Sequence, residues 1–214
     1  MCPSTAWSRS CTTASALADR GLAGHPVLAA TAAAYLVAFT AYGVATDARQ
    51  TVTYPLTVVV AALGIAAIDK RVGLSQVALL GLWLWGLGHI AGGMVGLDGS
   101  RVLYNAELLF PIHFDNVVHF IGFGAAGLTA WEAFRLRLAS PWMVFVMVWL
   151  LGQGVGAINE VVEYIIAKTV EDSNIGGFDN TGRDLIANLL GSSVAGVIAA
   201  RRTPPSRIFR YSAG

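Results

Sequence analysis

Apolar residues run along the chain in six long stretches, and most of these end at charged or turn-forming residues. A helix needs about 20 mainly apolar residues to cross the hydrocarbon core of a bilayer, so each stretch is a candidate transmembrane helix. The fifth stretch opens at Pro141, a residue that suits the first turn of a helix. The six predicted spans cover about residues 26–46, 52–68, 74–97, 116–134, 141–168 and 184–200.

The composition narrows the class of protein. Of the 214 residues, 55% are hydrophobic and 13% are charged, whereas a soluble domain carries about 25% charged residues. The 14 Lys and Arg nearly balance the 13 Asp and Glu, so no bulk charge indicates nucleic-acid binding. The chain has two cysteines, Cys2 and Cys11, and both lie near the N-terminus. Two cysteines are too few for a disulfide framework or a thiolate metal site. We therefore predict an all-α polytopic membrane helix bundle of about six transmembrane helices.

Basic residues predict the direction of the bundle. With six spans, one side of the membrane carries ten Lys and Arg side chains and the other side carries four. The side with ten holds both chain ends, so we expect both termini in the cytoplasm. We expect residues 1–24 to be a poorly ordered tail, 25–202 a single transmembrane helical domain, and 203–214 a basic tail.

Ionisable and amide side chains inside the spans gather at one depth. A charged group inside a membrane costs about 2.5–3.5 kcal/mol on insertion scales, so such groups are candidates for function. With the predicted topology applied, these groups come from four helices of alternating direction and all fall in the outer half. Residues three or four apart share a helix face, and glycines nearby let helices approach closely. We therefore predict one buried cluster within tightly packed helices, made by His89, Asp115, His119, Glu160, Glu163, Asp184 and Asn188.

The chemistry of this cluster has three interpretations. Four or five acids in a low-dielectric pocket cannot all stay ionised without compensation. A divalent cation is one solution: zinc, manganese or iron suits mixed His and carboxylate ligands, and magnesium suits an all-oxygen subset. The second is a protonated acid that serves in acid-base chemistry, and the third is a structural polar network or ion path. The candidate ligands are His89, Asp115, His119, Glu160, Glu163 and Asp184, of which the four acids are also the candidate catalytic residues.

Two connections lie on the same side of the membrane as the cluster. Residues 99–114 and 171–180 contain turn-forming and polar residues, and we expect them to cover the pocket as lids. They contribute His113 and Asp179, which together with Asn188 we predict to bind or orient the substrate. Of the remaining acids, Glu132 is expected to pair with Arg135, and Asp69 is interpreted as an ordinary boundary charge.

Three segments carry a resemblance to a known family. Asp115-Asn-Val-Val-His119-Phe resembles the D-x-x-x-H-F signature of VanZ-like membrane proteins, and Asn159-Glu160-Val-Val-Glu163 and Asp184-Leu-Ile-Ala-Asn188 continue the order. With residues 88–93 added, the chain is most similar to the uncharacterised YjdF-type inner-membrane family, over about residues 50–200. VanZ-like members commonly have Lys where this chain has Asn116, and Gln where it has Glu163. The resemblance implies a multi-pass protein of the bacterial cytoplasmic membrane and supplies no reaction.

From these observations the favoured function is an intramembrane enzyme. Its pocket would open toward the outer leaflet and act on a lipid-like or isoprenoid substrate by metal-assisted or acid-base chemistry. One alternative is a transporter or channel that uses the same acids as a proton or cation path. Another is an accessory protein of the cell envelope whose polar cluster only fixes helix packing. Membrane lipids are the expected surroundings, and no nucleic-acid partner is expected.

Overall fold

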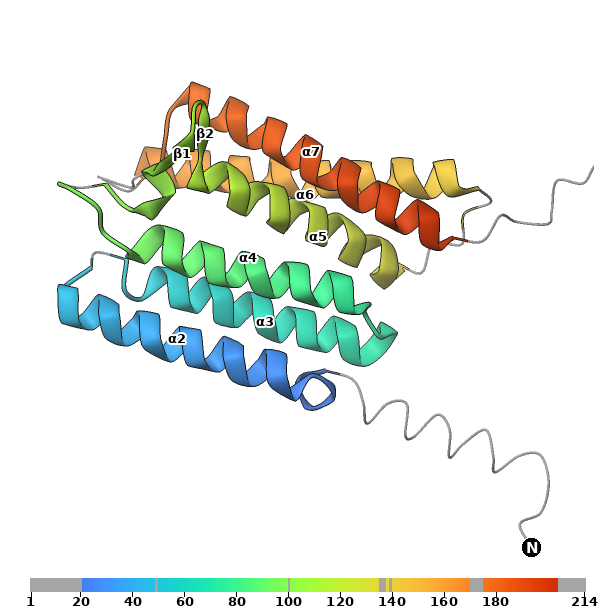
Figure 1. Cartoon of the computed structure of the whole chain (residues 1–214), viewed down its shortest axis with the longest axis horizontal. Coiled ribbons are helices and arrows are strands. Elements are labelled where there is room, and N and C mark those ends of the chain that lie inside the picture. Colours follow the sequence, from blue (N-terminus) through green and yellow to red (C-terminus); the bar gives the residue numbers. More distant parts are fainter. Residues whose placement is uncertain are drawn as a thin grey trace, which may run out of the picture.

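The computed structural model describes residues 21–48, 50–99, 101–134, 138, 140–169 and 175–203. Within this part of the chain, six long helices lie side by side in one bundle (Figure 1). They are α2 (Pro26–Thr46), α3 (Thr53–Val72), α4 (Gln76–Met94), α5 (Phe114–Phe134), α6 (Pro141–Thr169) and α7 (Phe178–Arg202). The prediction of an all-α bundle is confirmed. The minor elements are the 3-10 helices η1 (Leu22–Gly24) and η2 (Leu103–Asn105) and the antiparallel strands β1 (Glu107–Leu109) and β2 (Ile112–His113).

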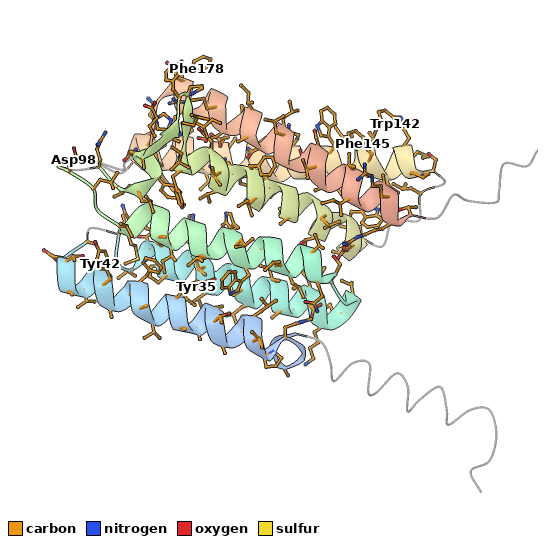
Figure 2. The ribbon with its side chains drawn as sticks, in the orientation of Figure 1. Tyr35, Tyr42, Asp98, Trp142, Phe145 and Phe178 are labelled. Atoms are coloured by element: carbon orange, nitrogen blue, oxygen red, sulfur yellow. The ribbon has the colours of Figure 1, made fainter. Side chains whose placement is uncertain are left out.

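Five of the six helices are long and apolar enough to cross a membrane, namely α2, α4, α5, α6 and α7. The sixth, α3, has 20 residues and ends in the charged run Asp69-Lys70-Arg71. Large apolar side chains are exposed on the outside of the bundle, and Trp142 near the start of α6 is an example (Figure 2). A bilayer is the solvent that accommodates such a surface.

Helix boundaries agree closely with the apolar pattern except at the end of α3, which continues through the charged run to Val72, and at the start of α7. The predicted first span coincides with α2, whereas α7 begins at Phe178 and not near Asp184 as expected. The apolar pattern misses this start because the first turns of α7 are polar, with Asp179, Asn180 and Arg183. The proposed lid of residues 171–180 is therefore partly helix, and residues 171–174 lie outside the described residues.

The helices run alternately up and down, so the two described chain ends lie at the same end of the bundle (Figure 1). We call this the terminal end. The other end, which we call the site end, carries η2, the hairpin of β1 and β2, and the start of α7. Of the predicted tails, residues 1–20 and 204–214 lie outside the described part of the chain. Residues 22–24, which we assigned to the first tail, form η1.

Tight packing among α5, α6 and α7 positions the polar residues. A Cβ atom at Gly124 of α5 would lie 2.7 Å from the carbonyl oxygen of Gly191 on α7. A Cβ atom at Gly191 would overlap the carbonyl oxygen of Phe120 on α5. The backbones of α5 and α7 therefore approach as closely as glycine allows, which confirms the predicted packing.

At the terminal end, Asp69 does not have the role that the charge pattern indicated. Its side chain is 1% exposed and accepts hydrogen bonds from the backbone N–H groups of Leu74, at 2.7 Å, and Gly21, at 2.5 Å. The left-handed backbone of Gly73, with φ at 70°, turns the chain so that Leu74 faces the carboxylate. The interpretation of Asp69 as an ordinary boundary charge is therefore wrong.

Glu132 has a partner that the sequence analysis did not name. Its carboxylate accepts a hydrogen bond from the backbone N–H of Ser75 at 2.8 Å. Ser75 is the N-cap of α4, and its own side chain accepts from Ala78 N–H. Glu132 therefore helps to join α5 to the start of α4, and the expected partner Arg135 lies outside the described residues.

Candidate functional site

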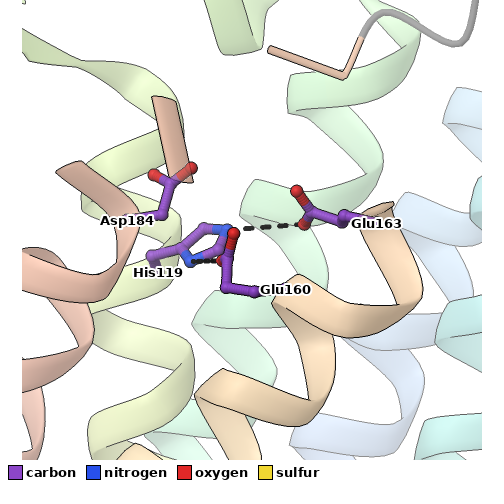
Figure 3. A group of neighbouring side chains, drawn as sticks. All are labelled: His119, Glu160, Glu163 and Asp184. Carbon is purple, nitrogen blue, oxygen red and sulfur yellow. Dashed lines mark ion pairs between the residues drawn. The ribbon is translucent and has the colours of Figure 1, made fainter. Parts of the chain in front are cut away.

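Four ionisable side chains from three helices meet near the site end of the bundle (Figure 3). His119 comes from α5, Glu160 and Glu163 come from α6, and Asp184 comes from α7. Each residue offers one nitrogen or oxygen atom, and these atoms all lie within 4.8 Å of one another. We call these four residues the acid cluster. The predicted convergence of polar groups from separate helices is confirmed for them.

His119 lies between the carboxylates. Its Nδ1 atom is 3.5 Å from Oε1 of Glu160, and its Nε2 atom is 3.7 Å from Oε1 of Glu163 (Figure 3). The same Nε2 atom is 3.7 Å from Oδ1 of Asp115, one helical turn earlier on α5. Oδ1 of Asn188 lies 3.2 Å from Nδ1. Both ring nitrogens therefore face oxygen atoms, which places the imidazole at the centre of the acid cluster.

Glu160 is the unsatisfied member of the acid cluster. Its side chain is 7% exposed, and neither of its carboxylate oxygens has a hydrogen-bond partner among the described residues. Buried carboxylates in native proteins are almost always paired, hydrogen-bonded or bound to a cation, because removing the charge from water is costly. The neighbouring amide nitrogen of Asn188 is also buried without a partner. The carboxylate of Glu160 and the amide nitrogen of Asn188 can therefore form hydrogen bonds that no described residue provides.

Three asparagines hold the other carboxylates in place. Asn116 and Asn180 donate to Asp184 at 2.8 and 2.5 Å, and Asn159 donates to Glu163 at 2.6 Å. Amide groups that orient carboxylates in this way are typical of the residues that surround metal ligands. Sequence analysis assigned no role to these three asparagines. A signal was present, because Asn159 and Asn180 each precede their acid by four residues and so share its helix face.

The acid cluster lies beside a cleft of about 220 Å³ between the two halves of the bundle. His119, Glu163 and Asp115 line it, together with residues of α3, α4 and α6. Residues of both α3 and α6 line the cleft, among them Tyr54 and Val162. We call it the lateral cleft.

An aromatic wall faces the acids across the lateral cleft, and His89 belongs to it. The His89 ring stacks on Trp85, with centroids 5.1 Å apart, and Tyr54 meets it edge-on at 5.0 Å. The hydroxyl of Tyr104 lies 2.7 Å from Nδ1 of His89. Burial raises the pKa of Tyr104 well above its usual range, so the two side chains share a hydrogen bond with a neutral hydroxyl. Two predicted metal ligands, His89 and Asp115, therefore lie outside the group of four.

A second cavity, of about 430 Å³, lies at the site end, and we call it the mouth. His113, Asp179 and Arg183 line it, and it shares Tyr104 and Asn180 with the lateral cleft. The three predicted substrate-binding residues are thus divided between two places. His113 and Asp179 lie in the mouth, whereas Asn188 is fully buried next to His119. Sequence analysis assigned no role at the site to Arg183, although this residue comes directly before Asp184.

No curated protein and no solved structure matches the chain. A family model does match, over residues 27–204, which include the six long helices apart from Pro26, the first residue of α2, and every residue of the acid cluster. Its description is a predicted membrane protein, DUF2238. The chain therefore belongs to the DUF2238 family of membrane proteins.

Proposed function

We propose that the protein is a metal-dependent enzyme within the membrane that acts on a lipid-like substrate. In this proposal the acid cluster holds a divalent cation. The observation that carries it is Glu160, a buried carboxylate that accepts no hydrogen bond from the described residues and whose polar neighbour is the His119 ring, with Nδ1 3.5 Å from Oε1, within a group of four potential ligands. A cation would compensate the buried negative charge that His119 alone cannot balance.

The donor set favours a particular class of ion. One imidazole with three carboxylates suits zinc, manganese or iron better than calcium, which prefers oxygen ligands only. Carboxylates and histidine presented by neighbouring helices are also how metal sites in helix bundles are built. Such an ion supplies an activated water or stabilises a phosphoryl oxygen. Asp115 and Asn188, which contact His119, would orient its ring, and Asn116 and Asn180 would orient Asp184.

The lateral cleft supports a lipid-like substrate. Its lining combines the acids with apolar side chains such as Val118, Phe123 and Val162. Val162 is exposed on the outside of α6, where the bilayer would lie. A substrate with an apolar chain could therefore enter sideways from the membrane and present its polar end to the acid cluster.

The position of the apolar core disfavours a transport path. At the terminal end of the bundle, buried apolar residues fill the space between the helices that carry the acid cluster. A proton or cation path would need polar groups through that half as well. This core is formed by Ala78, Leu128, Val144, Val148, Ala195 and Ala199, with Trp131 and Leu138 packed against it.

We also propose that the protein lies in the bacterial cytoplasmic membrane and that it is related to VanZ-like proteins. The segments that carry that resemblance contain Asp115, His119, the two glutamates, Asp184 and Asn188, which are the residues of the acid cluster and its neighbours. A shared site would account for the resemblance without requiring a shared substrate.

Metal content tests the proposal. We expect the native protein, purified in detergent, to carry a divalent metal in stoichiometric amount by mass spectrometry, and Glu160→Gln and Asp184→Asn to lose it. Asp98→Asn is the matched control, because Asp98 is an exposed acid at the same end. Glu163→Gln, at a half-exposed ligand, repeats the test should the buried variants fail to fold. A native protein without bound metal, or a Glu160→Gln variant that retains it, would overturn the proposal. Ion flux in proteoliposomes that the same substitutions abolish would point to transport instead.

A further inference from the structure

Resting on the proposed function, we propose that the mouth binds the phosphate group of the lipid substrate. Arg183, His113 and the N-terminal turn of α7 would form the binding site. The substrate would then be a lipid phosphate. Its phosphate would lie next to the acid cluster, and its apolar chain would lie in the lateral cleft.

Arg183 is the main argument. Its Nη1 atom lies 3.2 Å from Nδ1 of His113, while its Nε atom is buried without a hydrogen-bond partner. A guanidinium group can only donate, so Nδ1 of His113 accepts, and the ring carries its hydrogen on Nε2. No carboxylate of the described residues is paired with Arg183. Both side chains line the mouth, and a guanidinium group without a carboxylate partner among the described residues is suited to an anion with several oxygens.

The start of α7 adds to the positive potential of the mouth. Helix α7 has 25 residues, and Gly177 at its N-cap provides no side-chain acceptor. Exposed backbone N–H groups and the helix dipole favour an anion at such a terminus. Asp179 lines the same cavity and opposes this effect, but its side chain is exposed, so solvent screens its charge.

A chain of hydrogen bonds joins the mouth to the acid cluster. The backbone N–H of His113 donates to Oδ1 of Asn116 at 2.8 Å, and Nδ2 of Asn116 donates to Asp184. The mouth and the lateral cleft also share Asn180, which donates to Asp184 as well. A phosphate in the mouth would therefore lie beside the proposed cation, where a developing negative charge is stabilised.

Exposed apolar side chains at this end of the bundle favour a phosphate carried by a lipid over free phosphate. Phe178, which lines the mouth at the start of α7, is 91% exposed (Figure 2). Leu109 and Phe110 of the β1–β2 hairpin, whose second strand carries His113, are exposed as well. Exposed apolar side chains at the end of a transmembrane bundle are suited to the interfacial region of the bilayer. The mouth would then lie at the depth of lipid headgroups.

Binding of a short prenyl monophosphate tests the inference, with the corresponding prenyl alcohol and inorganic phosphate as comparison probes. We expect calorimetry on the purified protein to show that Arg183→Gln weakens prenyl phosphate binding about tenfold or more, because a charge-assisted contact is lost. Binding of the prenyl alcohol should not change. Arg101→Gln is the matched control, since Arg101 is an exposed arginine at the same end whose partner is Asp98. It should bind the prenyl phosphate as the native protein does.

The outcomes separate this inference from the proposed function. Arg183→Gln should retain its metal, so a variant that loses phosphate binding but keeps metal supports the phosphate site. Unchanged prenyl phosphate binding in Arg183→Gln would overturn the phosphate site, even where the native protein holds metal. Arg183-dependent binding in a protein without metal would overturn the metal centre and leave the phosphate site standing. Equal affinity for inorganic phosphate and prenyl phosphate would overturn the lipid source.

Discussion

Two buried carboxylates of the bundle differ in how their oxygens are used. Each lies close to a histidine ring nitrogen, Asp69 at 3.4 Å from His25 and Glu160 at 3.5 Å from His119, but Asp69 also accepts two backbone hydrogen bonds, whereas Glu160 accepts none from the described residues. A buried carboxylate without hydrogen bonds lowers the stability of a fold unless a ligand compensates its charge. The contrast is what the proposed metal centre predicts, with Asp69 stabilising the fold and Glu160 binding the ion.

We predict that Asp69→Asn destabilises the protein by about 1–3 kcal/mol, the cost of leaving a buried donor unpaired. The amide oxygen can serve Leu74 or Gly21, but the amide nitrogen then faces the other backbone N–H group. Thermal unfolding in detergent measures the change. Asp47→Asn is the matched control, because Asp47 is an exposed helix C-cap in the left-handed region, where asparagine is well tolerated. Equal unfolding temperatures for the two variants would contradict this account of Asp69.

A second residue-scale prediction concerns the two histidines of the site. We expect His119→Gln to lose bound metal, since both of its ring nitrogens face the acid cluster or its neighbours. His89→Gln should retain the metal, because the His89 ring is held in the aromatic wall by Trp85 and Tyr104. Mass spectrometry of the two purified variants provides the comparison. Loss of metal from both variants would indicate that His89 is a metal ligand, as the sequence analysis predicted.

At the scale of the elements, the apolar pattern predicted the helices well because lipid-facing and core-facing residues are both apolar in a membrane bundle. Helix α2 agrees at both ends. The pattern was less informative where a helix leaves the hydrocarbon, because polar residues such as Asp179 and Asn180 are compatible with either helix or loop. The hairpin of β1 and β2 had no apolar period to reveal it, since its strands have three and two residues.

The contact between α5 and α7 gives a prediction at this scale. Gly191→Ala should push these helices apart, because its Cβ atom would overlap the backbone of Phe120. Asp184 and Asn188 on α7 would then move relative to His119, so we expect both a lower unfolding temperature and less bound metal. Gly154→Ala on α6 is the control, since a Cβ atom there has nothing within 4 Å. Alanine favours helix over glycine by about 1 kcal/mol, so this variant should be at least as stable as the native protein. Identical behaviour of the two variants would contradict the proposed role of the close contact.

At the scale of the whole molecule, the acid cluster lies in the half of the bundle at the site end, and the apolar core of α4, α5, α6 and α7 lies in the half at the terminal end. The sequence predicted this division because alternating helix directions convert positions along the chain into depths in the membrane. It did not predict that His89 would line the lateral cleft with His119 and Glu163 and yet lie outside the acid cluster. That distinction depends on how each helix is rotated and which helices are neighbours, and both follow from long-range packing such as the glycine contact of α5 with α7.

The orientation of this division in the membrane gives the last prediction. The excess of basic residues at the terminal end predicts that this end faces the cytoplasm and that the mouth faces outward. In a chain with Cys2 and Cys11 replaced by serine, Asp98→Cys should react with a membrane-impermeant maleimide in intact bacterial cells. Lys70→Cys, at the terminal end, should react only after the membrane is permeabilised. Both positions are exposed, and the Asp98–Arg101 pair is a surface ion pair that contributes little to stability, so neither variant should disturb the fold. The reverse labelling pattern would place the mouth in the cytoplasm, and a substrate would then have to come from the inner leaflet.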